Sequence, residues 1–481
     1  MKKLIVIVFI IFGAFLTLCL YKTFAYDTSV VEEVPSTTDL EYTFKIGNSS
    51  IKQITVDSGE TRYYDIVLGN PNNAKISYSV YYEMVSPSTK PDGYKIEYTS
   101  KSTGNSTGIV NNNGNITLNI VVTNTSSSSV TVKVGTVAGY VKGGELTLNS
   151  GQEVIPKRLT AAEYVMTLND NTSGDEGSGV YKIEHSAIPA SNSATGSEIP
   201  AVTDYRYYGP NPNNYICLDM EGGSTCPDKH LYRIIGSIYE EKENTNRIKL
   251  IKATPLTDGT TSAFSWDYTS SGSYSNIWAT ITSGNYSNSL TSGSTLMQLL
   301  NSGAWWNGTS GSYYNQSNTA TTVNFTNYKL SDKAKSYITT SRYYLGGFNN
   351  TPPLTNEMYG YERGILRYDT NRPLYWEGMV GLMYPSDYGY AAGNSCVNGT
   401  KLYDYNGYGN KDWLYISDIY QSLMSPYSGH FCSLFSVGYA GRVVIDNDVF
   451  EDLAVSPVFY LTSTTSIIDG DGSLNNPYIL K

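Results

Sequence analysis

The stretch ISYSVYYEM, residues 76–84, decides the fold of the first half of the chain. Its alternation places five side chains on one face of a strand: Ile76, Tyr78, Val80, Tyr82 and Met84. Residues 130–138 alternate in the same way, and clusters of Gly, Asn and Pro between such runs predict turns. Because a sheet with one apolar face must bury that face against another layer, we expect residues 41–150 to form a β-sandwich domain.

The second half differs, because its expected strands are short and its loops are long, polar and rich in aromatic residues. Thr160 and Glu163 have the spacing of a capping box, which predicts the start of a helix. Residues 169–200 are rich in Ser, Gly, Asp and Asn, which is typical of a linker. We therefore expect a short helix and linker over residues 151–200, then an α+β domain over 201–481, in a chain that is mainly β overall.

Hydrophobic periodicity also places the main elements of this second domain. The expected strands are residues 231–235, 248–252, 380–384 and 458–461, and the expected short helices are residues 295–300 and 332–339. Long loops held by such a scaffold are where binding residues commonly lie.

The first 25 residues predict export. Lys2 and Lys3 precede an apolar run from Leu4 to Leu20, longer than the core of most signal peptides and at the short end of a membrane span. Both a cleaved signal peptide and a retained membrane anchor fit this run, and residues 26–40 are expected to be a linker. In either case the lysines stay in the cytoplasm and the rest of the chain reaches the outer face of the cell.

The charge balance argues against a nucleic-acid partner. The chain has 33 basic and 43 acidic residues, a net charge of −10, and no cluster of Lys and Arg that could follow a phosphate backbone. Charged residues make up 16% of the chain, against about 25% in typical domains. Uncharged polar side chains therefore form much of the surface.

Four cysteines follow the leader: Cys217, Cys226, Cys396 and Cys432. An even number in an exported chain predicts disulfides. We favour Cys217 with Cys226, nine positions apart in the sequence, which leaves Cys396 with Cys432. No two of these cysteines have the spacing of a zinc motif, and we expect neither a metal site nor a cofactor.

A series of motifs runs in order through the second half: YRYYGPNPNNYI (205–216), LYRIIG (231–236), LMQLLN (296–301), VGLMYPSDYGYA (380–391), SPVFYL (456–461) and GDGSLNNPYIL (470–480). This series resembles an uncharacterised family of exported bacterial proteins. The resemblance implies the fold shared by C-type lectins and formylglycine-generating enzymes, preceded by an immunoglobulin-like module. It implies a scaffold without the chemistry of those relatives, since their copper-binding cysteine pair and their calcium and sugar signatures find no match here.

Aromatic loops are the candidate ligand site. Tyr and Trp combine a flat apolar face with a polar group, which suits stacking on sugar rings or docking on a protein. We expect one of the two adjacent tryptophans to anchor its loop, and Trp278, Trp376 and Trp413 to pack in the core. The candidate ligand-binding residues are Trp305, Trp306, Asn307, Tyr313, Tyr314, Asn315, Asp387 and Tyr388.

The leading functional hypothesis is non-catalytic recognition or adhesion of a cell-surface glycan or protein. A structural component of a surface layer or fibre is the second hypothesis. A glycan-processing enzyme is the third, and it would need paired carboxylates, for which the loop acids Glu357, Glu362 and Asp387 are the candidates. We assign no catalytic residue, we interpret Asp387 as also organising a turn, and we interpret His185, His230 and His430 as structural.

Overall fold

The computed structural model describes residues 43–46, 53–100, 108–140, 146–169, 174, 177–345, 347–365, 372–407 and 411–481. The chain divides into two compact units, Met1–Arg158 and Leu159–Lys481. The predicted signal or anchor segment, residues 1–25, and the linker over 26–40 lie outside the described residues. Among the helices of the described residues, none is long and apolar enough to cross a membrane.

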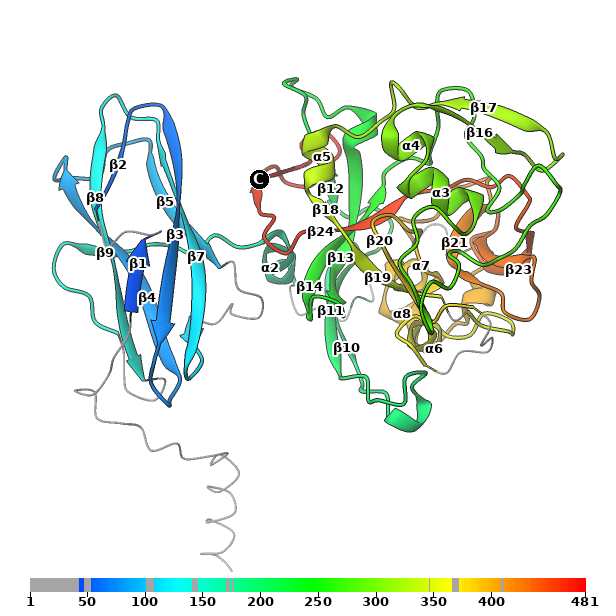
Figure 1. The fold of residues 1–481 in the computed structure, drawn as a ribbon, viewed down its shortest axis with the longest axis horizontal. Helices are drawn as coiled ribbons and strands as arrows, with labels where there is room; N and C mark the ends of the chain where they lie inside the picture. Colours follow the sequence, from blue (N-terminus) through cyan, green and yellow to red (C-terminus); the bar gives the residue numbers. More distant parts are fainter. Residues whose placement is uncertain are drawn as a thin grey trace, which may run out of the picture. The chain divides into compact units, whose positions relative to one another are not determined.

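The first unit consists of two antiparallel sheets (Figure 1). One sheet has the strand order β1 (Thr43–Ile46), β3 (Glu60–Asn70), β7 (Gly114–Asn124) and β5 (Tyr94–Ser100). The other has the order β2 (Gln53–Val56), β8 (Val130–Tyr140), β4 (Ile76–Ser86) and β6 (Ile109–Val110), with β9 (Gln152–Val154) also paired to β4.

The core of the first unit follows from alternation along its strands. In β4 the side chains of Ile76, Tyr78, Val80 and Tyr82 are buried, and Met84 is partly buried against the same cluster. Side chains from both sheets contribute to this single core. The two sheets therefore bury their apolar faces against each other, as the alternation predicts.

The second unit is built on a nine-stranded sheet (Figure 1). Its strands are β10 (Gly179–His185), β11 (Val202–Tyr208), β12 (Tyr215–Cys217), β13 (Leu231–Glu240), β14 (Thr245–Lys252), β18 (Ile338–Thr339), β24 (Val458–Leu461), β25 (Ile467–Asp469) and β26 (Tyr478–Leu480). Its centre is the antiparallel hairpin of β13 and β14, and β24, far away in the sequence, pairs with β14.

Smaller sheets and short helices surround the large sheet. The sheets are β15 (Tyr286–Ser287), β20 (Tyr375–Gly378) and β19 (Ser341–Tyr344); β16 (Ser310–Tyr314) and β17 (Ala320–Asn324); and β21 (Gln421–Pro426), β22 (Ser433–Val437) and β23 (Val443–Asp448). The helices are α2 (Ala161–Thr167), α3 (Thr295–Asn301), α4 (Ala304–Asn307), α5 (Asp332–Ser336), α6 (Thr355–Tyr361), α7 (Pro385–Ala391) and α8 (Asn394–Val397). The chain is thus mainly β with short helices, which confirms the predicted class.

Local signals in the sequence are confirmed at some elements and wrong at others. The capping box at the start of α2 is present, with Thr160 and Glu163 satisfying each other's backbone N–H groups. The linker predicted over residues 169–200 is wrong at β10, which pairs with β11 over seven residues. The predicted strand over 380–384 is also wrong, since only a single bridge from Gly381 to Val458 forms there.

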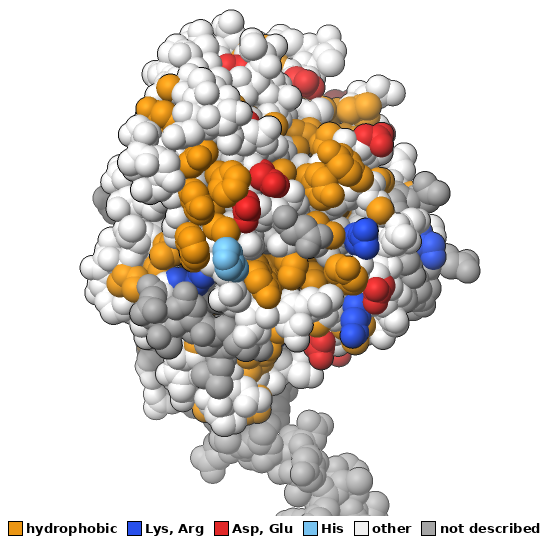
Figure 2. All heavy atoms as spheres, turned by 90° about the vertical axis from the view of Figure 1, so that its right-hand side faces the viewer, with side chains coloured by type: hydrophobic (Ala, Val, Ile, Leu, Met, Phe, Trp, Pro, Cys, Tyr) orange, Lys and Arg blue, Asp and Glu red, His pale blue; other side chains and the backbone are white. Residues whose placement is uncertain are grey.

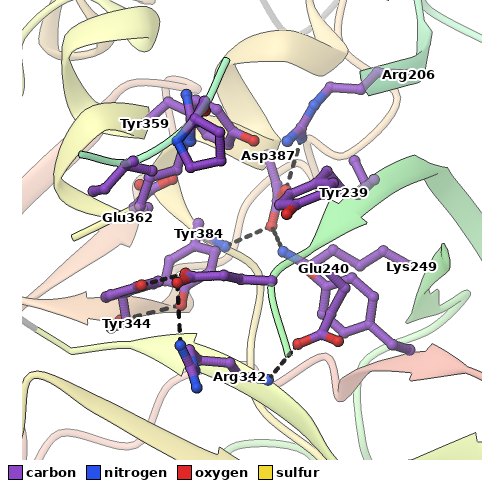
Figure 3. A pocket seen from close by; sticks show the side chains of 16 residues that line it. Arg206, Tyr239, Glu240, Lys249, Arg342, Tyr344, Tyr359, Glu362, Tyr384 and Asp387 are labelled. Carbon is purple, nitrogen blue, oxygen red and sulfur yellow. Dashed lines mark hydrogen bonds and ion pairs between the residues drawn. The ribbon is translucent and has the colours of Figure 1, made fainter. Parts of the chain in front are cut away.

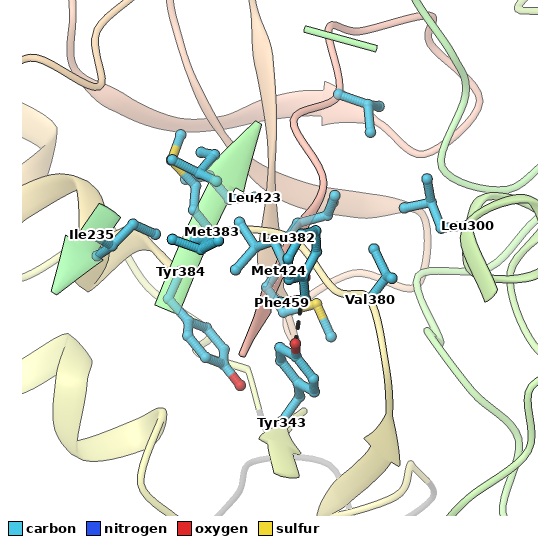
Figure 4. Close-up of a cluster of buried hydrophobic side chains, with 14 of the residues drawn as sticks. Ile235, Leu300, Tyr343, Val380, Leu382, Met383, Tyr384, Leu423, Met424 and Phe459 are labelled. Atoms are coloured by element: carbon cyan, nitrogen blue, oxygen red, sulfur yellow. Dashed lines mark hydrogen bonds between the residues drawn. The ribbon is translucent and has the colours of Figure 1, made fainter. Parts of the chain in front are cut away.

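The segment before α7 contributes to the core instead of to a sheet. Val380, Leu382 and Met383 are buried against Phe459 of β24 and other apolar side chains (Figure 4). The same cluster contains Trp278, Trp376 and Trp413, which confirms that these tryptophans pack in the core. Apolar burial of this kind is the main favourable contribution to folding.

The cysteines form one disulfide in place of two. Cys217 is bonded to Cys226, as predicted. The predicted bond between Cys396 and Cys432 is wrong, because both are buried and neither is part of a disulfide. Instead, the Cys432 thiol lies 2.9 Å from Nδ1 of His430 and 3.1 Å from Oδ1 of Asp448.

Replacing both Cys217 and Cys226 with Ser should lower the free energy of unfolding by about 2–3 kcal/mol, because the cross-link limits the entropy of the unfolded chain. Urea denaturation with and without reductant would measure this effect. Peptide mapping without reduction should recover the Cys217–Cys226 link and leave Cys396 and Cys432 as thiols. A peptide linking Cys396 to Cys432 would contradict the structure.

Candidate functional site

The central hairpin carries charged side chains into the interior. In β14, with the sequence TNRIKLIK, alternation places Arg247 and Lys249 on one face. Both are buried, as is Glu240 of β13, which pairs with Arg247 at 3.1 Å. An unpaired charge at such depth would be very costly, so each needs an opposite charge nearby.

The partner of Lys249 is Asp387 of α7 (Figure 3). Lys249 Nζ lies 2.5 Å from Oδ2 of Asp387, and Arg206 Nη1 of β11 lies 2.8 Å from Oδ1. Arg206 also pairs with Asp204 at 2.9 Å. Asp387, Lys249 and Arg206 each expose only 1–2% of their side chains. We call Asp387 with its two cationic partners the buried charge cluster.

The cluster also explains how α7 begins. The backbone N–H of Tyr384, just before α7, donates to Oδ2 of Asp387 at 2.9 Å. Asp387 is therefore a helix-start residue that binds two buried cations, and the predicted turn at this position is wrong. Burial by itself raises the pKa of Asp387, but the charges of Lys249 and Arg206 outweigh that effect and hold the pKa below its ordinary value.

A second carboxyl, that of Glu362, lies close to this cluster, but its pKa is raised where that of Asp387 is lowered. Glu362, directly after α6, is buried and accepts hydrogen bonds from the hydroxyl and the backbone N–H of Ser386. Burial is the main cause that raises the pKa of Glu362 to about 8, and the negative charge of Asp387 adds to it. At neutral pH the Glu362 carboxyl is therefore mostly protonated beside an ionised Asp387.

Two of the three acids proposed from the sequence for an enzyme thus line one cavity. Glu362 and Asp387 line it, whereas Glu357 is exposed on α6. Carboxyls with pKa values driven apart are typical of acid–base pairs. The cavity, however, has a volume of only about 50 Å³, whereas ligand pockets usually span about 300–1,000 Å³. It has room for a few water molecules but not for a sugar ring.

A larger, open groove lies elsewhere in this unit, between α3, α4 and β16. We call it the α3–α4 groove, and its volume is about 510 Å³. The lining consists of uncharged residues: Thr291, Thr295, Gln298, Leu299, Ser302, Gly303, Ala304, Asn307, Thr309, Ser310, Gly311, Ser312 and Tyr313.

Several polar side chains of the groove are exposed and available. The hydroxyls of Thr291, Thr309, Ser310 and Ser312 make no hydrogen bond within the part of the chain that the structure describes. Asn307 is exposed as well, and its Nδ2 donates to the carbonyl of Ser302 at 2.6 Å, which leaves its amide oxygen toward solvent. The groove can therefore form several hydrogen bonds with a ligand, but none of its lining residues is charged.

The candidate aromatic residues are divided between groove, surface and core. Asn307 and Tyr313 line the groove. Trp305 is buried, as expected for one of the two tryptophans, so its prediction as a ligand-binding residue is wrong. Trp306 is half-buried, with the Lys335 ammonium 5.1 Å from its ring centre.

The other candidates lie outside the groove lining. Tyr314 is half-buried, and Asn315 holds the turn between β16 and β17 by accepting N–H groups of Ser317 and Thr319. Tyr388 is fully buried and donates its hydroxyl to the Gly441 carbonyl, so it presents no face to a ligand.

The sequence analysis did not predict one cluster of titratable side chains. In it, the Cys432 thiol contacts both His430 and Asp448. The sequence places His430 two positions before Cys432, and the turn before β22 brings the two side chains together. Burial, with help from Asp448, raises the pKa of the Cys432 thiol to about 11, so the reactive thiolate is scarce. Within the described ranges, no group of three or more His, Cys, Asp or Glu side chains is placed to hold a metal ion.

No protein family model matches this chain, and neither does a curated protein or a solved structure. Its function must therefore be argued from the geometry of its own residues.

Replacing Asp387 with Asn should lower the free energy of unfolding by about 3–5 kcal/mol, because it leaves Lys249 without its buried partner. Glu357→Gln removes an exposed acid and should change stability by less than about 0.5 kcal/mol. Chemical denaturation of both variants beside the wild type would test this contrast. Equal, small effects would show that the cluster does not stabilise the fold.

Glu362 should make stability fall as pH rises. The unfolded chain loses this proton near 4.5 and the folded chain near 8, so between these values the folded state binds more protons than the unfolded state. The contribution is fully present below pH 4.5 and is lost as pH rises to about 8, at about 1.4 kcal/mol per pH unit. Glu362→Gln should remove this slope and Glu357→Gln should retain it, as measured by denaturation from pH 5 to 9. A wild-type slope unchanged in Glu362→Gln would contradict the assignment.

Proposed function

We propose that this protein is an exported bacterial cell-surface protein that recognises an uncharged glycan through the α3–α4 groove. In this proposal the second unit is a C-type-lectin-like binding head, the first is an immunoglobulin-like β-sandwich, and the apolar segment at residues 1–25 carries the signal for export. The disulfide Cys217–Cys226 agrees with an oxidising location. The motif series quoted above supports the lectin-like assignment.

The uncharged lining of the groove carries the proposal. Not one of its thirteen lining residues is charged, and four hydroxyls are available there. Nucleic acids, phosphorylated ligands and acidic glycans would each be expected to meet a basic side chain. A ligand rich in neutral hydroxyls can instead pair with Ser, Thr and Asn side chains at little electrostatic cost.

The enzyme hypothesis finds less support. Its acid pair, Glu362 and Asp387, lines the cavity of about 50 Å³ and not the groove. Asp387 is also fully engaged by Lys249 and Arg206, which leaves it poorly placed to act as a nucleophile or a base.

A screen of neutral and acidic oligosaccharides against the purified full-length chain would test the proposal, with affinities measured by calorimetry. We expect a neutral oligosaccharide to bind and the binding to be lost in Ser312→Trp, because the large side chain fills the groove. Ser317→Trp is the matched control, since Ser317 is also exposed but lies in the hairpin turn outside the groove lining.

The expected outcome is loss of binding with Ser312→Trp alone. Binding restricted to acidic glycans, or equal binding by both tryptophan variants, would contradict a neutral ligand in this groove. If no oligosaccharide in the screen binds and the chain assembles as its concentration rises, the surface-layer or fibre hypothesis would be favoured.

A further inference from the structure

Asp267 connects the groove to a neighbouring set of loops. Its side chain is mostly buried, and its two carboxylate oxygens accept from different segments. Oδ1 accepts the backbone N–H of Thr295, a groove residue, at 3.1 Å, and Oδ2 accepts that of Ser275 at 2.9 Å. The backbone N–H of Asp267 donates to the Val449 carbonyl at 3.0 Å. One residue thus fixes the end of the groove against two loops.

Together with a fourth loop that carries Phe431, these segments bring four aromatic side chains into contact: Tyr268, Tyr274, Phe431 and Phe450. We call them the aromatic platform. Tyr274 and Phe431 stack with their planes 3° apart and ring centres 5.9 Å apart, and Phe450 lies 5.0 Å from Tyr274. Phe431 exposes 61% of its surface.

Phe431 is exposed, the other three rings of the platform are half-buried, and the loops that carry them are held in place. Figure 2 shows one face of the molecule on which hydrophobic side chains gather. His430 is the exposed one of the three histidines, and its ring lies 5.2 Å from Phe431. Asn276 holds the loop of Phe431 beside that of Tyr274, because its backbone N–H donates to the Phe431 carbonyl and its Nδ2 to the His430 carbonyl, each at 2.8 Å.

A hydrogen bond joins the platform to one end of the groove. The backbone N–H of Tyr268 donates to Oγ1 of the groove residue Thr295 at 3.3 Å. Tyr268 in turn contacts Tyr274 and Phe450, with ring centres 5.9 and 5.6 Å away. The ring contacts of the platform thus begin at the residue that is bonded to the Thr295 end of the groove.

We propose that the groove and the aromatic platform form one extended site, which takes a neutral oligosaccharide of several units. The groove supplies hydrogen bonds to the hydroxyls of one or two units, and the platform stacks against the C–H faces of the units that follow. This inference rests on the proposed function and adds to it the length of the ligand. A sugar chain fits both parts because each of its units has hydroxyl edges and apolar ring faces, whereas an apolar peptide side chain would leave the hydroxyls of the groove without hydrogen-bond partners.

The test is the affinity of the full-length chain for neutral oligosaccharides of one to six units, taken from the series that binds in the screen. We expect affinity to rise with length in the wild type. In Phe431→Ala the short ligands should bind as in the wild type, while the longest should lose about 5- to 10-fold. Because Phe431 is largely exposed, this variant should keep the wild-type melting temperature.

Tyr63→Ala, which removes an exposed aromatic side chain of the first unit, is the matched control and should leave all affinities unchanged. Binding that is lost in Ser312→Trp but shows no length dependence and no effect of Phe431→Ala would overturn the extended site and leave the proposed function standing. If no neutral oligosaccharide binds at any length, the extended site and the proposed function are both contradicted.

Discussion

The second unit depends on the buried ion pair between Lys249 and Asp387. Lys249 lies on the central hairpin and Asp387 at the start of α7, 138 positions apart in the sequence. Arg206 of β11 binds the same carboxylate. The Asp387 side chain therefore links α7 to two strands of the large sheet, β11 and β14. Removing charges from water is expensive, so the arrangement is favourable only with all three groups in place. This requirement makes the packing of α7 on the sheet specific.

The distribution of charge separates the interior of this unit from its candidate binding surface. Arg206, Lys249 and Asp387 are used inside, where they neutralise one another and leave only a small cavity. The α3–α4 groove, by contrast, is lined by hydroxyl, amide and apolar groups alone. A buried charge cluster with a perturbed carboxyl would ordinarily suggest catalysis. Here the charged cavity, at about 50 Å³, is much smaller than the neutral groove, at about 510 Å³.

Part of the candidate site could be predicted from the sequence. Asn307 and Tyr313 belong to an aromatic-rich segment that the sequence predicts as a loop; the structure places them in α4 and β16 instead, and both line the groove. The hydroxyls of Thr291 and Ser312 carry no such signal, since isolated Ser and Thr occur throughout this surface. Glu362 and Asp387 were recognisable as candidate acids, but their opposite protonation states come from neighbours that are distant in the sequence.

The sequence by itself determined the class of structure, the two halves and the local elements. Alternation defined β4, a capping box started α2, and a nine-residue separation predicted the bond of Cys217 to Cys226. These signals depend on neighbours within a few positions, so the chain reports them directly. Only the tertiary structure decided that Lys249 is buried, that Cys396 does not bond to Cys432, and that Thr295 adjoins an aromatic platform. Those outcomes depend on which distant segment covers each face, and the periodicity of a single segment carries no information about its partner.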